Sequence, residues 1–220
     1  MALSRDEVVR AAVRLLDEAG LQGLTLRNLA ACLGVSAPTL YWYVKDKRAL
    51  LDLMAEAIVE ENRPAPRPAH GQPWWDWLGE GAWAQYRALV SHRDGALVVA
   101  GNRPTQAALP VVEQVVGSLV EVGFPPAEAL ESILTVGHFV IGSAVEYQAE
   151  AARGTATDRD AALAVRMRDD DLPNLAGAVS ARTAPDPDAT FRHGLALILT
   201  GLRVRHRELI GEPTAEAADR

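Results

Sequence analysis

The residue types best suited to chemistry are concentrated in one short N-terminal segment, residues 36–47. Small Ala37 and Pro38 would allow close approach to base edges and thymine methyl groups, while Thr39, Tyr41 and Lys47 can reach phosphate oxygens. This mixture favours noncovalent binding of a nucleic acid, although each aromatic residue could equally serve in packing. The candidate contacts are Ser36, Ala37, Pro38, Thr39, Tyr41, Trp42, Tyr43, Lys45 and Lys47.

Patterns for catalysis or metal binding are absent from the sequence. It has no glycine-rich phosphate loop, no HExxH motif and no Ser/His/Asp arrangement in a familiar context. The single cysteine, Cys32, excludes an intramolecular disulfide and a thiolate zinc site within one chain. His92, Arg93 and Asp94 are adjacent, but neighbours at a helix end point in different directions. We therefore expect neither an enzyme nor a bound metal or other cofactor.

Composition and charge describe a soluble globular chain of one or two domains. The 220 residues are 49% hydrophobic, and no uninterrupted apolar run reaches the roughly 18 residues that a membrane span needs. Charged residues from Arg5 onward interrupt any secretory signal, so we expect a cytoplasmic protein without membrane contact. Residues 1–50 hold seven Lys or Arg against five Asp or Glu, a net +2, whereas the whole chain carries −7. Only the N-terminal region could therefore approach a polyanion.

Helical periodicity dominates the N-terminal region. Apolar residues at helical spacing predict helices near residues 6–19, 26–33, 36–44 and 46–62, with Pro38 in the first turn of the third. The tight turn between the second and third helices fits a helix-turn-helix, whose third helix enters the major groove of DNA. The residues expected to cap or terminate these helices are Ser4, Gly20, Thr25, Gly34, Ser36 and Asp46.

A proline-rich stretch, residues 63–73, separates this head (residues 1–62) from a larger body (residues 63–220). The stretch is either a linker or a loop packed on the body. Further helices are predicted at 74–91, 94–100, 106–122, 125–152 and 188–209, and residues 153–187 are expected to be partly mobile with one short helix near 160–168. The two long apolar helices at 125–152 and 188–209 would suit a dimer interface, or are simply core helices.

The predicted fold class is therefore all-α in two domains. We place an N-terminal three-helix helix-turn-helix domain at residues 1–46, a connecting helix at 47–62 and a C-terminal helical ligand-binding and dimerisation domain at 63–210. Residues 211–220 are expected to form a disordered tail.

The region from Leu24 to Ile58 closely resembles the DNA-binding head of the tetracycline repressor (TetR) family. It reads LTLRNLAACLGVSAPTLYWYVKDKRALLDLMAEAI, and its LAxxLGVSxPTLYxxVxxKxxLL pattern spans more than 20 positions. The body is similar to the tetracycline-repressor subgroup at RDGALVVAGNRP, VGFPPAEAL and HFVIGSAVEYQ. The resemblance implies an all-helical homodimer that binds palindromic double-stranded operator DNA and releases it when a small-molecule inducer enters the body.

Carried over by motif, the DNA contacts implied by the resemblance are Arg27, Pro38, Thr39, Tyr41, Trp42 and Lys47. Ala37 departs from the pattern, because the tetracycline repressors have a base-reading polar side chain at this position. Their operator sequence is therefore not implied for this chain.

The resemblance weakens where a ligand would be bound. The histidine with which tetracycline repressors hold a magnesium–drug complex falls on Val99, and the histidine at the end of their fourth helix falls on Arg63. Their pocket asparagine, phenylalanine and glutamine fall on Gly81, Gln85 and Val115. Because a valine offers no lone pair to a metal, we expect no magnesium requirement and a weak or absent response to tetracycline.

An apolar cavity with a few polar groups remains the expected ligand site. The valines, Trp77 and His138 could instead be core residues, whereas Arg103 and Pro104 lie in a predicted hinge loop. A constitutive DNA-binding regulator without a ligand, a true tetracycline-responsive repressor and an activator remain alternatives. The predicted ligand-binding residues are Arg63, Trp77, Gly81, Trp83, Gln85, Val99, Arg103, Pro104, Val112, Val115, Ile133 and His138.

Overall fold

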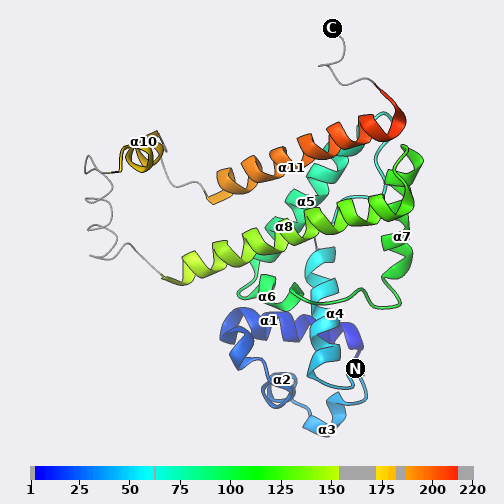
Figure 1. Ribbon diagram of the computed structural model, residues 1–220. Helices are drawn as coiled ribbons and strands as arrows, with labels where there is room; N and C mark the ends of the chain where they lie inside the picture. Colours follow the sequence, from blue (N-terminus) through cyan, green and yellow to red (C-terminus); the bar gives the residue numbers. More distant parts are fainter. Residues whose placement is uncertain (1–2, 62, 154–171, 182–186, 213–220) are drawn as a thin grey trace, which may run out of the picture.

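The computed structural model describes residues 3–61, 63–153, 172–181 and 187–212, and all regular structure within these ranges is helical (Figure 1). This confirms the all-α prediction. The head contains α1 (Arg5–Gly23), α2 (Leu26–Leu33), α3 (Ala37–Leu40) and α4 (Lys47–Glu60). The body contains α5 (Trp74–Ser91), α6 (Gly95–Val99), α7 (Leu109–Glu121), α8 (Pro126–Arg153), α10 (Pro173–Ala181) and α11 (Pro187–Ile210).

The helices of the head begin at the predicted capping residues. The Ser4 hydroxyl accepts a hydrogen bond from the Glu7 amide at 3.2 Å, and the Glu7 carboxylate accepts one from the Ser4 amide at 2.7 Å. Such a reciprocal pair satisfies two amides that the first helical turn leaves unpaired. The side chains of Thr25 and Asp46 each accept one amide hydrogen bond and so cap α2 and α4, and α2 ends at Gly34 in the left-handed conformation.

Gly20 breaks α1, as predicted, but the chain adds one further turn to Gly23. Gly20 has a φ of 69° and a ψ of 176°, which an L side chain rarely adopts. A Cβ atom at this position would also lie 3.0 Å from side-chain atoms of Arg93 and Asp94, in the corner between α5 and α6. The glycine is therefore required both by its backbone and by the close approach of the body.

The body is organised around α8, which packs against α5, α6, α7 and α11 (Figure 1). By length and composition alone α8 is apolar enough to cross a bilayer, but its inner face is buried among these helices. One aromatic cluster joins α5 to α11 through the stacked rings of Tyr86 and Phe191, 4.1 Å apart. A second cluster, at the other end of α5, contains Trp74 and Phe124.

The proline-rich stretch is a loop packed on the body, which decides between the two interpretations of residues 63–73. The indole nitrogen of Trp77 donates to the carbonyl oxygen of Ala65 at 3.0 Å, and Arg67 forms an ion pair with Glu121 at 2.8 Å. The helix expected near 160–168 and residues 213–220 of the tail lie outside the described residues. Helix α10 was not predicted, because its sequence has no strong apolar periodicity.

Candidate functional site

The predicted nucleic-acid surface is built on α3, a single helical turn. Leu29 of α2 and Leu40 of α3 are completely buried and hold the two helices together. The Ser36 and Thr39 hydroxyls lie 2.7 Å apart in a hydrogen bond across the first turn. Because Leu40 holds α3 against the core, the side chains on the opposite side of α3 can face outward.

The aromatic residues after α3 differ in burial. Trp42 is 87% exposed and Tyr41 is also exposed, whereas Tyr43 is half-buried against the core. Packing therefore accounts for the position of Tyr43, whereas the exposed rings of Tyr41 and Trp42 are available to a binding partner.

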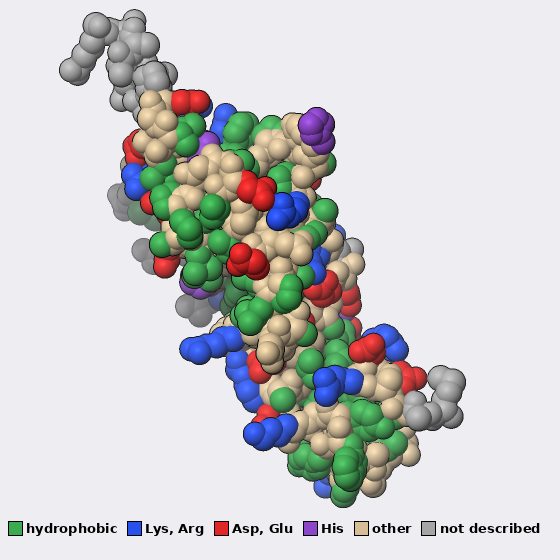
Figure 2. Space-filling view, turned by 90° about the vertical axis from the view of Figure 1, so that its right-hand side faces the viewer, with side chains coloured by type: hydrophobic (Ala, Val, Ile, Leu, Met, Phe, Trp, Pro, Cys, Tyr) green, Lys and Arg blue, Asp and Glu red, His purple; other side chains and the backbone are tan. Residues whose placement is uncertain are grey.

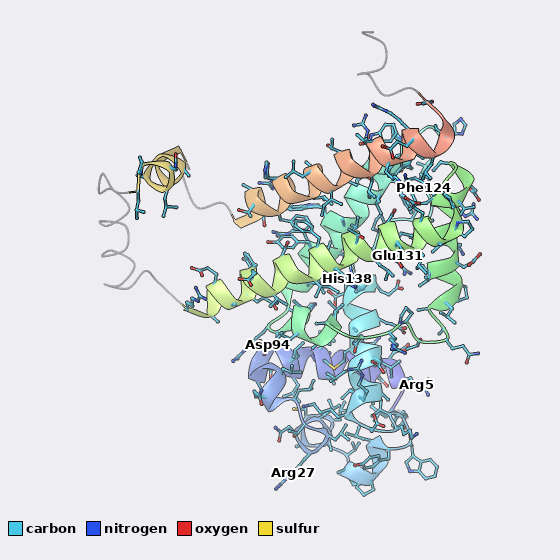
Figure 3. The ribbon with its side chains drawn as sticks, viewed as in Figure 1. Arg5, Arg27, Asp94, Phe124, Glu131 and His138 are labelled. Carbon is cyan, nitrogen blue, oxygen red and sulfur yellow. The ribbon has the colours of Figure 1, made fainter. Side chains whose placement is uncertain are left out.

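Basic side chains surround this region of the head. Lys45 and Lys47 are exposed, and Arg27 projects from α2 at the end of the head farthest from the body (Figure 3). On the face shown in the space-filling view, both the head and the body carry basic, acidic and apolar side chains (Figure 2). The part of the head around α3 therefore combines exposed basic side chains with exposed aromatic rings.

A cavity of about 330 Å³ lies where the end of α4 and the loop after it meet α5, α7 and α8. Most of its wall is apolar. The structure places seven of the predicted ligand-binding residues in its lining, namely Arg63, Trp77, Gly81, Gln85, Val115, Ile133 and His138. His138 lies midway along α8 (Figure 3).

The other predicted ligand-binding residues lie elsewhere. Trp83 packs beside Phe191, with its ring centroid 5.4 Å from the guanidinium of Arg192. Val99 on α6 is buried in the core and does not line the cavity. Arg103 and Pro104 are exposed in the loop between α6 and α7, and Val112 lines a shallow groove between α7 and α8. The structure does not bring these five residues to the cavity.

Sequence reasoning missed Asn102, which lines the same cavity. Its side-chain nitrogen donates to the carbonyl oxygens of Leu51 at 3.1 Å and Val98 at 2.7 Å. Its side-chain oxygen is buried and has no hydrogen-bond partner in the described part of the chain. The sequence carried no signal for this role, because the two acceptors are backbone atoms. The loop residues Pro64, Ala65 and Pro66 and Val59 of α4 were also missed.

The polar groups of the cavity do not form a magnesium site. They are the side chains of Arg63, Gln85, Asn102 and His138, and none is a carboxylate. Arg63 is already paired with Glu60 at 2.5 Å. Magnesium requires several oxygen ligands in octahedral geometry, and within the described ranges no group of three or more His, Cys, Asp or Glu could hold a metal ion.

Hydrogen bonds join the head to the body on both sides of α6. From the loop after α6, the Thr105 amide donates to the Glu56 carboxylate at 2.7 Å, and Gly101 accepts from the Arg48 guanidinium at 2.9 Å. From the corner before α6, Asp94 accepts from the Leu21 amide at 2.8 Å. Helix α4, whose last turn lines the cavity, is therefore attached to the body along most of its length.

Comparison with known proteins assigns both halves of the chain. Residues 8–54 match the model of bacterial regulatory proteins of the tetR family, and residues 67–206 match the tetracycline repressor-like C-terminal domain. The class D tetracycline repressor protein of Escherichia coli is 39% identical over 209 residues, which cover 94% of this chain and 93% of the relative.

Two solved structures are similar over nearly their whole length. One is ActR of Streptomyces coelicolor without ligand, with a TM-score of 0.81 and 27% identity, covering 94% of this chain and 99% of that one. The other is the class A tetracycline repressor in complex with 5a,6-anhydrotetracycline and magnesium, with a TM-score of 0.68 and 33% identity, covering 91% and 98%.

Proposed function

This chain belongs to the TetR family of transcriptional repressors, and we propose that it binds a palindromic operator as a homodimer and releases it when a small organic molecule enters the body. The observation that carries this proposal is the position of the cavity. Val59 and Arg63, at the end of the helix that supports the DNA-binding head, are part of its wall. A molecule in the cavity would therefore contact α4 directly.

Helix α4 is the element through which the ligand would act. The ligand must bind the DNA-incompetent dimer more tightly than the competent one, and this difference sets the largest loss of operator affinity. The two recognition helices of a dimer must reach major grooves about 34–36 Å apart. A small tilt of α4 would change this spacing. Asn102 supports this role of α4, because its side chain lines the cavity and is hydrogen-bonded to α4 at Leu51.

The inducer is proposed to be a molecule other than the tetracycline–magnesium complex. The cavity offers Arg63, Gln85, Asn102 and His138 on otherwise apolar walls. These groups suit an acidic or polyhydroxylated hydrophobic molecule better than a metal chelate, because arginine pairs with anions and the amides bind hydroxyl groups. Relatives are regulators rather than enzymes, and no catalytic role is proposed.

Dimerisation is supported by exposed apolar side chains on the two long body helices. Leu197 and Val204 on α11 are exposed in the single chain, and so are Leu130 and Leu134 on α8, which also line the α7–α8 groove and the cavity, respectively. A second copy packed on these helices would bury them. A homodimer with two heads matches a palindromic operator, and a regulator of this kind acts in the cytoplasm.

The DNA contacts are proposed to be Arg27, Ser36, Ala37, Pro38, Thr39, Tyr41, Trp42, Tyr43 and Lys47. Trp42 and Lys47 are exposed and so are available to phosphates and sugars. Ala37 has no hydrogen-bonding side chain for a base edge, so contact with thymine methyl groups is the readout proposed there. The operator is therefore expected to differ from those of the tetracycline repressors.

The test is binding of the purified protein to the DNA upstream of its own gene, titrated first with salt and then with tetracycline and magnesium. Sequence-specific, salt-sensitive binding is expected, whereas binding equal to that of random DNA would contradict the operator proposal. Release by tetracycline with magnesium would show a tetracycline-responsive repressor instead. Specific binding that no compound of an acidic and polyhydroxylated library releases would favour a constitutive regulator.

A further inference from the structure

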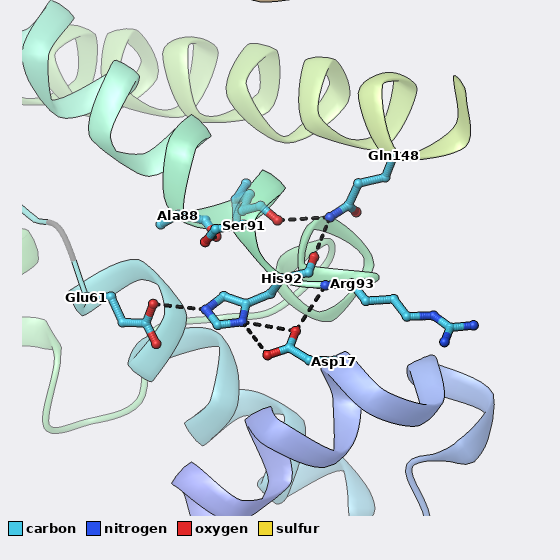
Figure 4. Close-up of polar contacts among 8 residues, drawn as sticks. Asp17, Glu61, Ala88, Ser91, His92, Arg93 and Gln148 are labelled. Carbon is cyan, nitrogen blue, oxygen red and sulfur yellow. Dashed lines mark hydrogen bonds and ion pairs between the residues drawn. The ribbon is translucent and has the colours of Figure 1, made fainter. Parts of the chain in front are cut away.

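His92 joins two helices of the head to the body. It lies in the corner between α5 and α6, with Asp17 of α1 on one side of its ring and Glu61, which follows α4, on the other (Figure 4). Its Nδ1 atom is 3.0 Å from Oδ2 of Asp17, and its Nε2 atom is 2.9 Å from Oε2 of Glu61. The two carboxylates are 75 and 31 residues away in the sequence, so only the fold brings them together.

The corner that carries the ring is held in place by further hydrogen bonds. The side-chain amide of Gln148 on α8 donates to the carbonyl oxygens of Leu89 at 2.9 Å and His92 at 2.7 Å. The Arg93 amide donates to Asp17 at 3.1 Å. The His92 side chain is only 12% exposed. The imidazole is therefore fixed between the two carboxylates rather than free to rotate into solvent.

This geometry requires a protonated imidazole. An ionised carboxylate can only accept hydrogen bonds, so both ring nitrogens of His92 must donate. A neutral imidazole has one N–H group and would present a lone pair to the second carboxylate. Burial of His92 opposes its charge, but the hydrogen bonds and negative charges of Glu61 and Asp17 outweigh burial and hold the pKa of His92 above its ordinary value.

The charged groups around the ring come from every element that packs on it. Asp17 and Glu18 lie on α1, and Glu61 follows α4. Arg93 and Asp94 belong to the corner itself, but the Arg93 guanidinium donates to the carbonyl oxygen of Glu18 and Asp94 accepts from Leu21. From α8 the contacting side chain is the neutral Gln148. The two carboxylates hydrogen-bonded to the ring thus determine the charge that it faces.

We propose that His92 is a proton-dependent latch between the head and the body, so that the proton is a second effector of operator binding. The protonated ring joins α1 and the end of α4 to the α5–α6 corner. Loss of the proton releases one of the two carboxylates, and the head is then held to this corner by fewer contacts. Because operator affinity depends on the placement of the heads, it becomes dependent on pH. This operator effect rests on the proposed function, whereas the latch itself does not.

The decisive variant is Glu61→Gln. The glutamine amide can donate to the Nε2 lone pair of a neutral His92 while Nδ1–H still donates to Asp17, so the contacts persist without the proton. Glu18→Gln is the matched control, because it removes an exposed carboxylate on the same helix as Asp17 without a bond to the ring. Each protein is titrated in full length by NMR of its histidine rings, with His92→Gln used to assign the signal.

We expect His92 to titrate above the ordinary value of about 6.5 in the wild type and in Glu18→Gln, and lower in Glu61→Gln. The Arg93 amide donates to Asp17 and the Glu61 amide donates to Ile58 at the end of α4, so hydrogen exchange of these two amides reports which carboxylate is released. Corrected for its intrinsic pH dependence, exchange of at least one of them should accelerate as His92 loses its proton in the wild type but not in Glu61→Gln. An ordinary or lowered pKa in the wild type, or identical exchange profiles, would overturn the latch whether or not the protein binds DNA.

A second experiment measures the dissociation constant of the protein–operator complex at about pH 6 and at about pH 8.5, at constant ionic strength, and takes the ratio of the two values. The ratio of the two dissociation constants should differ between the wild type and Glu61→Gln by about threefold to tenfold. This is the size expected for one hydrogen bond of ordinary net strength, because solvent screens the half-exposed carboxylates. The Glu18→Gln ratio should equal that of the wild type. Specific operator binding with the same pH profile in all three proteins would show that His92 is only a structural ion pair and would overturn the proposal.

Discussion

Asn102, in the loop after α6, donates a hydrogen bond to the carbonyl oxygen of Leu51 on α4 at 3.1 Å, and a second to Val98 on α6 at 2.7 Å. Both acceptors are backbone carbonyls, so the orientation of the amide is fixed. Because Asn102 also lines the cavity, one side chain contacts the ligand site, the body and the helix that supports the head.

Replacing Asn102 with alanine should therefore weaken the attachment of α4. The loss of two buried hydrogen bonds is expected to lower the free energy of unfolding by about 1–2 kcal/mol, measured by urea denaturation, and to change operator affinity. Arg48→Ala is the control. It removes a hydrogen bond to Gly101 and an ion pair with Asp52, but the Arg48 side chain is well exposed, so the effect should be much smaller. Equal stability of Asn102→Ala and the wild type would show that this residue does not connect α4 to α6.

Lys47 provides a test of the DNA surface. Lys47→Ala should weaken binding by a similar factor for all operator sequences and reduce the slope of the logarithm of the binding constant against the logarithm of salt concentration by about 1. The measurement is fluorescence anisotropy with labelled DNA at several salt concentrations. Arg153→Ala removes an exposed positive charge at the far end of α8 and should leave the slope unchanged. If both variants had the same slope, a specific phosphate contact at Lys47 would be excluded.

The sequence predicted the helices of the head because its signals are local, although α3 ends at Leu40 and not near Val44. Capping side chains such as Ser4 and Asp46 act on amides three residues away, and the apolar spacing that buries Leu29 and Leu40 can be counted directly. Helix α10 was missed because its composition gives no such periodicity.

The ligand site was predicted only in part, because its lining depends on how helices pack. Arg63 and Val115 were found through the family pattern. The family pattern cannot show that Val99 on α6 is buried in the core. It also cannot show that Arg103, in the loop after α6, is exposed. His92 was considered only with its sequence neighbours, whereas its partners Asp17 and Glu61 are distant in the chain.

The cavity composition predicts that magnesium will not support tetracycline binding. Isothermal titration with tetracycline should give no magnesium-dependent heat, and Val99→His should not create a response, because residue 99 is buried outside the cavity lining. The remaining polar groups also differ from a magnesium donor set. Nanomolar binding that disappears on addition of a chelator would contradict both the expected ligand class and the exclusion of the metal.

The raised pKa of His92 makes stability dependent on pH. Its folded-state pKa lies above the ordinary value, so the stabilisation is complete below about pH 6.5 and is lost as the pH rises through the raised pKa. The difference in free energy of unfolding between the wild type and His92→Gln should therefore be largest near pH 6. This difference should shrink toward pH 9. The gap is expected to be about 1 kcal/mol or less, because solvent screens the half-exposed carboxylates. A gap that grows with pH would mean that the ring is neutral in the folded protein.

Leu197 on α11 tests the proposed dimer interface. Its side chain is 62% exposed in the single chain, and a second copy on this face would bury it. Leu197→Arg would place an unpaired charge in that interface, which is costly, so sedimentation at micromolar concentration should show a monomer. Operator affinity should fall as well, because the two half-sites would no longer be bound by one linked particle.

Leu97→Arg is the matched control, since Leu97 is 47% exposed and lies on α6 rather than on α8 or α11. It should sediment as the wild type does. Dimeric Leu197→Arg together with monomeric Leu97→Arg would move the interface from α11 to the face of the molecule that carries α6. In that arrangement the second copy would lie beside the head, and the exposed leucines of α8 and α11 would need another explanation.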